Sequence, residues 1–146
     1  MRLQTATRLA LFAAIDLAGS PGVARSASDL AEAHHVSIAH MAKVMQALAR
    51  TGLVAPSRGA QGGYRFAANA RRTTLLDVIE QFEPVAVTGQ GAEVEGASDD
   101  ADAPVAAALD RVLKEIDDLA RATLGSITLD TMLKNLARAR DGALSQ

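Results

Sequence analysis

The chain has 146 residues, enough for one domain or for one domain with an additional arm. Apolar residues make up 49% of it and charged residues 22%, which excludes a disordered chain. Cysteine is absent, which excludes disulfides, thiol catalysis and Cys-ligated metal centres in this chain. No apolar run approaches a membrane span, and the first five residues lack the apolar stretch of a signal peptide, so we expect a soluble cytoplasmic protein.

The net charge of −2 hides an asymmetry between the two halves of the chain. Residues 1–84 contain nine Lys and Arg against six Asp and Glu, whereas residues 85–146 contain six against eleven. The first half is therefore mildly basic and the second half acidic. This distribution favours contact of the first half with a polyanion.

Two helices are predicted in the first 35 residues. The stretch 5–18 is rich in Ala and Leu, lacks Gly and Pro, and is expected to stop at Gly19. Ser26 can cap a second helix that has Asp29 in its first turn and ends near His34.

The third predicted helix has the clearest start signal, with Ser37 as its N-cap and Gly52 after its last turn. Its apolar face carries Met41, Val44, Met45 and Leu48. Its outward face carries Ala39, His40, Lys43 and Gln46, and no acidic residue occurs between Glu32 and Asp77. Two short helices joined by a brief turn indicate a helix-turn-helix.

A basic β-hairpin is predicted directly after the third helix. Residues 53–58 and 64–67 read as strands, and the intervening turn contains three glycines in five residues. Arg58 and Arg65 flank the tip, and Tyr64 is expected to pack against the core. A helix-turn-helix followed by such a hairpin is a winged helix.

The remaining chain is predicted to contain a fourth helix over 75–82 capped by Thr74, a polar loop over 85–104, and a helix of about five turns over 105–124 ended by Gly125. A short last helix starts at Thr128, and the tail after Arg140 is expected to fray. The long helix has one wide apolar stripe, which either packs on a partner surface or folds back on its own domain.

The predicted class is mainly α. Its regions are a winged helix-turn-helix domain (1–84), a loop (85–104), a long helix (105–125), and a C-terminal helix and tail (126–146).

These features resemble the IscR/NsrR family of bacterial winged-helix transcription regulators. The similarity is carried by the opening Met1-Arg2-Leu3, by residues 36–54, by residues 126–129, and by the wing Ser57-Arg58-Gly59-Ala60-Gln61-Gly62-Gly63-Tyr64, which matches the RG-x-x-GGY signature. Residues 36–54 resemble the NsrR branch, which senses nitric oxide. The resemblance implies a homodimer, held together by the long helix as a dimerisation helix, that reads a pseudo-palindromic operator in double-stranded DNA.

The residues expected to contact DNA lie in the third helix and the wing. Ser37, Ala39, His40 and Lys43 would face the major groove. Arg58 would enter a narrow minor groove, Gly59 would let the backbone approach the sugar-phosphate, Gln61 would face a minor-groove edge, and Arg65 would contact phosphate. The plain alternatives are a solvated surface histidine for His40 and a solvated Arg65.

Members of this family commonly bind an iron–sulfur cluster through three cysteines in the loop before the dimerisation helix. The NsrR-like spacing is Cys-x4-Cys-x5-Cys, and Ala92, Ala97 and Ala103 stand at that spacing here. Either the alanines replace native cysteines, and a cluster is expected only in the cysteine-bearing form, or the match is chance in an alanine-rich chain. The acidic residues of the same loop could hold a hard cation or simply be solvated.

The leading hypothesis is a dimeric, sequence-specific DNA-binding repressor. Its cysteine-bearing form would respond to nitric oxide, redox or iron–sulfur status, and this chain would be cluster-free. The alternative is a cluster-independent regulator of the same family controlled by a partner protein or a small ligand. An enzyme is not expected, because the sequence offers no convergent carboxylate pair, no Ser-His-Asp arrangement and no phosphate loop with a Gly-Lys-Ser/Thr ending.

Overall fold

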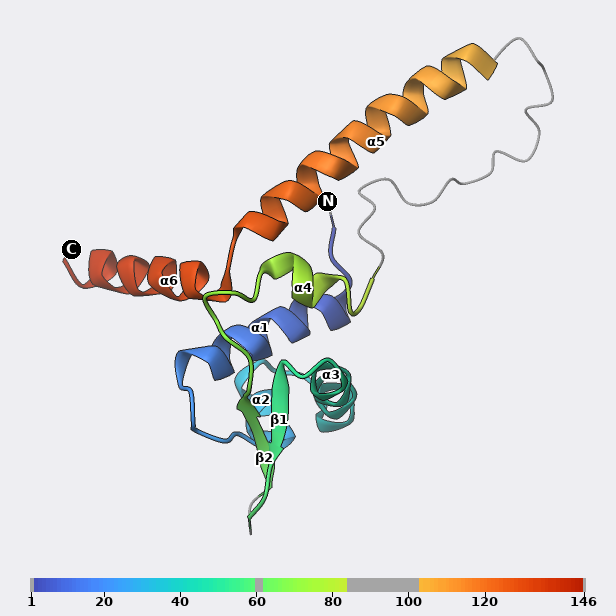
Figure 1. The fold of residues 1–146 in the computed structure, drawn as a ribbon. Coiled ribbons are helices and arrows are strands. Elements are labelled where there is room, and N and C mark those ends of the chain that lie inside the picture. Colours follow the sequence, from blue (N-terminus) through green and yellow to red (C-terminus); the bar gives the residue numbers. More distant parts are fainter. Residues whose placement is uncertain (1, 60–61, 84–102, 146) are drawn as a thin grey trace.

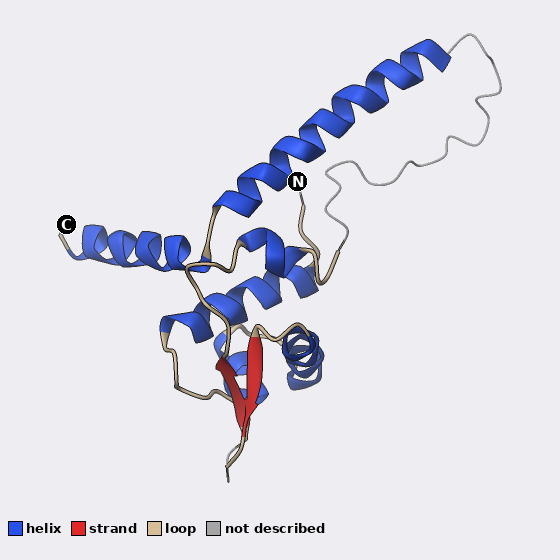
Figure 2. Cartoon of the chain, viewed as in Figure 1, coloured by secondary structure: helices blue, strands red, loops and turns tan. Residues whose placement is uncertain are grey.

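The computed structural model describes residues 2–59, 62–83 and 103–145. In chain order these residues form α1 (Thr5–Gly19), α2 (Ala27–Ala33), α3 (Ile38–Arg50), β1 (Val54–Ser57), β2 (Gly63–Phe66), α4 (Leu75–Ile79), α5 (Ala103–Ser126) and α6 (Leu129–Leu144). Figure 1 shows α1 to α4 and the hairpin gathered into one body, from which α5 and α6 leave in different directions. The predicted mainly α fold with a two-stranded wing is confirmed (Figure 2).

α1 lies at the centre of the body and contacts α3, α4, α6 and β2. Its side chains are mostly small, which lets several elements approach it closely. The fully buried positions of its core face include Ala10, Ala13, Ala14 and Leu17. The sequence-predicted helix over 5–18 is thus confirmed, with Gly19 as its last residue.

Side-chain caps begin both helices of the helix-turn-helix. The hydroxyl of Ser26 accepts a hydrogen bond from the N–H of Asp29 at 3.0 Å, and the Asp29 carboxylate accepts one from the N–H of Ser26 at 3.1 Å. The hydroxyl of Ser37 accepts one from the N–H of His40 at 3.1 Å. Between the helices, His35 has a φ of 56°, which makes the turn. The predicted starts of α2 and α3 are confirmed.

α3 is fixed to the body by its apolar face. The four predicted core residues of this helix are all buried, namely Met41, Val44, Met45 and Leu48. Gly52 follows with a φ of 80°, a conformation that glycine adopts without a Cβ penalty. The opposite face of α3 is therefore directed to solvent.

The wing is an antiparallel pair in which Val54 lies opposite Phe66 and Ser57 lies opposite Gly63. Val54 and Phe66 are buried at the base, so the hairpin is anchored where it leaves the body. Tyr64 is half-buried and packs against the core, as predicted.

Two predicted boundaries near the loop are wrong. α4 ends at Ile79, and residues 80–82 form turns instead of a continuing helix. α5 begins at Ala103, so the last two residues of the predicted loop, 103 and 104, are helical. Pro104 explains the second error, because proline is well suited to the first helical turn, where its missing N–H has no partner to lose. The rest of that loop lies outside the described residues.

The predicted ends of the last two helices are also wrong. α5 includes Gly125 and ends at Ser126, whose hydroxyl donates a hydrogen bond to the carbonyl of Thr123 at 2.7 Å. α6 continues to Leu144, so the predicted frayed tail after Arg140 is mostly helical. Residues 137–144 are mainly Ala, Arg and Leu, which favour helix strongly enough to carry it through Gly142.

Main-chain hydrogen bonds fasten the junction between α5 and α6 to the body. The N–H of Leu75 donates to the carbonyl of Ile127 at 2.9 Å, and the N–H of Leu129 donates to the carbonyl of Thr73 at 2.9 Å. From this junction α5 runs outward with none of its residues buried. The last turns of this helix contact α4, where Arg121 pairs with Glu80, but its apolar stripe does not fold back on the described part of its own domain. None of the described helices is long and apolar enough to cross a membrane.

Candidate nucleic-acid interface

The predicted major-groove residues lie in the cap and first two turns of α3. Ser37, Ala39 and Lys43 are exposed, and His40 is half-buried. The Ser37 oxygen is occupied as a helix cap, but its hydroxyl hydrogen can still be donated to a phosphate. The four residues thus share the end of α3 that a recognition helix directs into the major groove.

The wing lies beside α3, at the end of the body away from the tip of α5 (Figure 1). Arg58, Gly59 and Arg65 are exposed there, whereas Gln61 lies outside the described residues. The stretch between Glu32 and Asp77 includes α3 and both strands and holds no acidic residue. The surface formed by α3 and the wing is therefore positive in an otherwise acidic chain.

Sequence analysis missed an exposed apolar side chain on this surface. Ile38 is the first residue of α3, directly after the cap, and is 57% exposed. So exposed a side chain gains little from packing against the described part of its own chain, and no local pattern in the sequence signals its exposure. Contact with a thymine methyl is the chemistry that suits it.

A second missed residue is Arg25, which ties the wing to the body. Its N–H donates to the carbonyl of Tyr64 at 2.9 Å, and the N–H of Tyr64 donates to the carbonyl of Arg25 at 2.8 Å. The guanidinium of Arg25 is 2.5 Å from a carboxylate oxygen of Asp16 on α1. A Cβ at Gly63 would lie 2.9 Å from the Arg25 backbone, so only glycine fits this crossing without a shift.

A shallow cavity of about 610 Å³ separates the wing from the start of α2. Its charged lining residues are Arg58 and Asp29. The N–H and the hydroxyl of Ser26 stabilise the Asp29 carboxylate and lower its pKa below the usual range. The Asp29 carboxylate is engaged with the N-cap residue Ser26, and Arg58 is the one cationic side chain among the described lining residues.

The residues of this chain do not fit an iron–sulfur cluster. Ala103 is the first residue of α5 and carries only a methyl group, while Ala92 and Ala97 lie outside the described residues. The whole chain contains no cysteine thiolate. Among the described residues, no group of three His, Asp or Glu is placed to hold a metal ion.

Comparison with known proteins identifies the family of this chain. Residues 3–135 match the Rrf2 family model, described as iron-dependent transcriptional regulators. BadM of Rhodopseudomonas palustris, named as an HTH-type transcriptional regulator, is 43% identical over 134 residues, which cover 92% of this chain and 82% of BadM. The prediction that the chain is not an enzyme is confirmed, because the family and this relative are regulators.

Solved structures of regulators share the fold. CymR, the global cysteine regulator of B. subtilis, superposes with a TM-score of 0.74 at 24% identity and covers 92% of this chain and 98% of its own. T. potens IscR gives a TM-score of 0.68 at 27% identity over 95% of this chain and 90% of its own. The resemblance is confirmed at the level of the family, and the NsrR branch stays a prediction. The chain belongs to the Rrf2 family of transcriptional regulators.

Proposed function

We propose that this chain binds a specific DNA sequence as a homodimer and acts as a cytoplasmic repressor without a cluster. The observation that carries the proposal is that α3 and the wing, which contain no acidic residue, lie side by side. A positive surface formed by a helix and a hairpin matches the charge and the grooves of duplex DNA.

In the proposed complex, α3 enters the major groove with its N-terminal turns. Lys43 donates to guanine acceptors or to phosphate. His40, in the first turn of α3, donates to the same groups. Ala39 and Ile38 offer apolar contact to thymine methyl groups. Ser37 donates to a phosphate while it caps the helix.

The wing supplies the second set of contacts in this proposal. Arg58 enters the minor groove, where a narrow groove concentrates negative potential. Gly59 allows the backbone to come close to the sugar-phosphate, and Gln61 faces a base edge. Arg65 projects from β2 toward phosphate, because its neighbours Tyr64 and Phe66 turn into the body.

The homodimer in the proposal is formed by α5. Its exposed apolar residues follow a four-three spacing and are 43–69% exposed, namely Val105, Leu109, Val112, Ile116 and Leu119. This spacing averages 3.5 residues, the period at which two helices pack along a continuous seam. Two copies joined in this way would present two α3 helices to a pseudo-palindromic operator.

Sensing of nitric oxide, redox or iron–sulfur status belongs, in this proposal, only to a form that carries cysteine at 92, 97 and 103. The triple change Ala92→Cys, Ala97→Cys and Ala103→Cys, reconstituted with iron and sulfide without oxygen, tests that idea. A visible cluster band that bleaches with nitric oxide would support native ligand positions. A spectrum identical to that of the parent chain would reject them and leave the cluster-independent alternative.

The DNA-binding proposal is tested by selecting duplexes from a random library and measuring affinity by fluorescence anisotropy. We expect a selected duplex to bind at least about 1,000-fold more tightly than a scrambled one. The affinity should also fall steeply as salt rises, because bound Lys and Arg release counterions from phosphate. Equal binding of both duplexes, or an affinity flat in salt, would contradict the proposal.

A further inference from the structure

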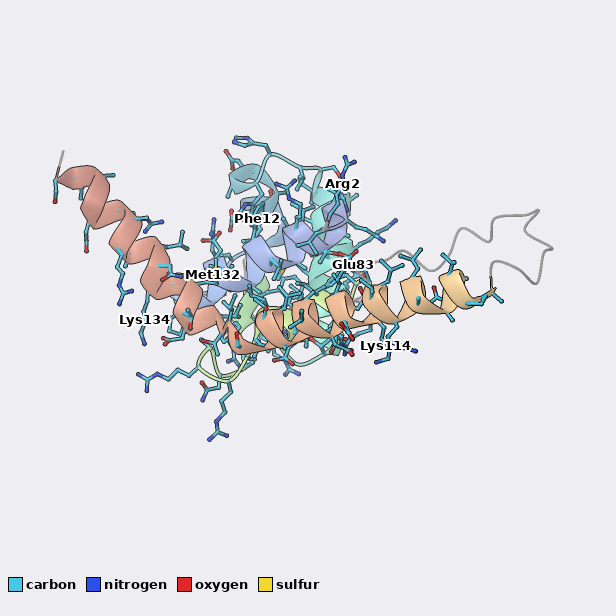
Figure 3. All side chains as sticks on the ribbon, turned by 90° about the horizontal axis from the view of Figure 1, so that it is seen from above. Arg2, Phe12, Glu83, Lys114, Met132 and Lys134 are labelled. Carbon is cyan, nitrogen blue, oxygen red and sulfur yellow. The ribbon has the colours of Figure 1, made fainter. Side chains whose placement is uncertain are left out.

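A second cavity, of about 440 Å³, lies between α1 and α6, away from the DNA-facing surface. Most of its lining is apolar, including Phe12, Met132 and Leu136. Figure 3 shows Phe12 on α1 and Met132 on α6, the two helices that form its walls. The volume and the mixture of apolar walls with few polar groups are typical of small-molecule sites.

Three ionisable side chains line the same cavity, namely Asp16, His34 and Arg140. The Asp16 carboxylate is neutralised by Arg25, at 2.5 Å. Arg140 is exposed and forms no ion pair within the described part of the chain, so the cavity has a spare positive charge. An anionic group is the complement of that charge.

His34 adds a second unsatisfied group. Its ring stacks on Phe12, with the centroids 5.6 Å apart. Its Nε2 atom is buried and has no hydrogen-bond partner among the described residues, although it lies 3.4 Å from a carboxylate oxygen of Asp16. A buried polar atom without a partner is costly, and a ligand that supplies a partner relieves this cost.

We propose that this cavity binds a small monocarboxylic acid with an apolar body, and that its occupation weakens DNA binding. The acid's carboxylate pairs with Arg140, and its apolar body lies against Phe12, Met132 and Leu136. The second half of this inference rests on the proposed DNA-binding function. It assigns a ligand to the cluster-independent mode of regulation.

Two cavity residues connect the site to the elements that would contact DNA. Asp16 holds the guanidinium of Arg25, whose backbone forms the two hydrogen bonds to Tyr64 in the wing. His34 caps the end of α2 and precedes the turn that orients α3. An anion placed beside Asp16 repels its carboxylate and loosens the pair with Arg25. The wing then loses part of its support.

The binding step is tested on the full chain without DNA, using octanoate and its neutral analogue octanamide in calorimetric titrations. We expect octanoate to bind at least tenfold more tightly than octanamide. Arg140→Gln should remove this difference, whereas Arg138→Gln, on the same helix but outside the cavity, should preserve it. Ala137→Phe, which fills the cavity, should abolish binding of both compounds.

Binding of neither probe, or equal binding of both by the parent chain, would overturn the ligand assignment. A preference that survives Arg140→Gln would overturn it as well. If Ala137→Phe converted a dimer to a monomer, the ligand assignment would also be overturned. That result would mean that the cavity is a contact between copies of the chain.

The regulatory step is measured as the affinity for the selected duplex with and without saturating octanoate. We expect at least a fivefold loss of affinity, and no loss in Arg140→Gln. Asp16→Asn, which releases Arg25 without a ligand, should weaken DNA binding by itself. Unchanged affinity at full occupation would overturn the coupling and leave the binding site standing. Absence of DNA binding in all samples would instead reject the proposed function, while the titrations would still report on the cavity.

Discussion

α3 and α5 have the same kind of apolar periodicity but opposite surroundings. In α3 the apolar face is buried in the body, with Met41, Met45 and Leu48 fully enclosed. In α5 none of the residues is buried, and Leu109 and Leu119 are 55% and 69% exposed. Periodicity predicts that a helix has an apolar face, but what covers that face depends on the rest of the fold. The apolar face of α3 is thus covered within one chain, whereas that of α5 would be covered by a second chain in the proposed homodimer.

The largest effect is expected from a charge placed in the α5 stripe. Leu109→Glu should convert the proposed dimer to a monomer and weaken DNA binding about 100-fold, equivalent to about 2.7 kcal/mol. The reason is that burying an unpaired carboxylate in the seam is unfavourable. Light scattering coupled to size-exclusion chromatography measures the mass, and anisotropy measures the affinity.

The matched control for that change is Lys114→Glu, which places the same side chain on the opposite face of α5. It should leave both mass and affinity unchanged, apart from a minor effect of losing the exposed pair with Asp118. If the parent chain were already monomeric, the proposal that a second chain covers the apolar face of α5 would be contradicted.

The next effect concerns the body. Gly63→Ala should lower the free energy of unfolding by about 2 kcal/mol, because its Cβ would meet the Arg25 backbone at 2.9 Å. Gly59→Ala is the control, since Gly59 has nearly the same φ but no atom of the described residues beyond its chain neighbours within 4 Å of its Cβ position. Urea denaturation measures both. Equal losses in the two variants would mean that the packing of the wing on Arg25 contributes nothing.

A smaller effect is expected from removing one cation of α3. Lys43→Ala should weaken binding to the selected duplex about tenfold, or about 1.4 kcal/mol, and reduce the salt dependence by roughly one counterion if Lys43 contacts phosphate. Lys134→Ala removes the same charge from α6 and should have no effect on DNA affinity. Similar losses in both variants would indicate a general charge effect instead of a contact made by α3.

A substitution at the N-cap of α3 should change the free energy of unfolding by a similar amount. Ser37→Ala should lower the free energy of unfolding by about 1 kcal/mol, because the N–H of His40 loses its acceptor. Ser37→Asp retains a capping oxygen and should restore stability while weakening DNA binding through repulsion of phosphate. If Ser37→Asp bound DNA as well as the parent, Ser37 would lie outside the interface.

The smallest expected effect is a pH dependence of stability. The N–H and hydroxyl of Ser26 lower the pKa of Asp29, and a hydrogen bond from Lys134 lowers the pKa of Asp130. Because these pKa values are lowered by folding, the stabilisation is complete above the usual carboxyl range. It is lost as the pH falls through the lowered pKa values. Asp29→Asn should therefore flatten the acid side of a plot of melting temperature against pH, and an unchanged plot would contradict this.

Local signals in the sequence were sufficient for the winged helix-turn-helix. The caps Ser26 and Ser37 and the core face of α3 act within a few residues, and each was predicted correctly. The contact of Arg25 with Tyr64 spans 39 positions along the chain, and no local pattern encodes it. The exposure of Ile38 was missed for a related reason, since an apolar residue is expected inside until the packing is known.

Both boundaries of α5 were predicted wrongly for identifiable reasons. Proline is typical of loops, but Pro104 suits a first helical turn, and glycine is typical of a helix end, but α5 includes Gly125. The residues that bring the α5–α6 junction to the body, Leu75 and Ile127, pair through main-chain atoms, so their side chains give no signal.

Hydroxyl-radical footprinting of the protein on its selected duplex tests directly whether two copies of α3 and the wing bind DNA together. We expect two protected patches related by pseudo-twofold symmetry, with centres one helical turn of about 10–10.5 base pairs apart or a multiple of it. That pattern requires two copies of α3 and the wing held by α5. A single patch would contradict the homodimer, and uniform cleavage would contradict specific binding by this surface.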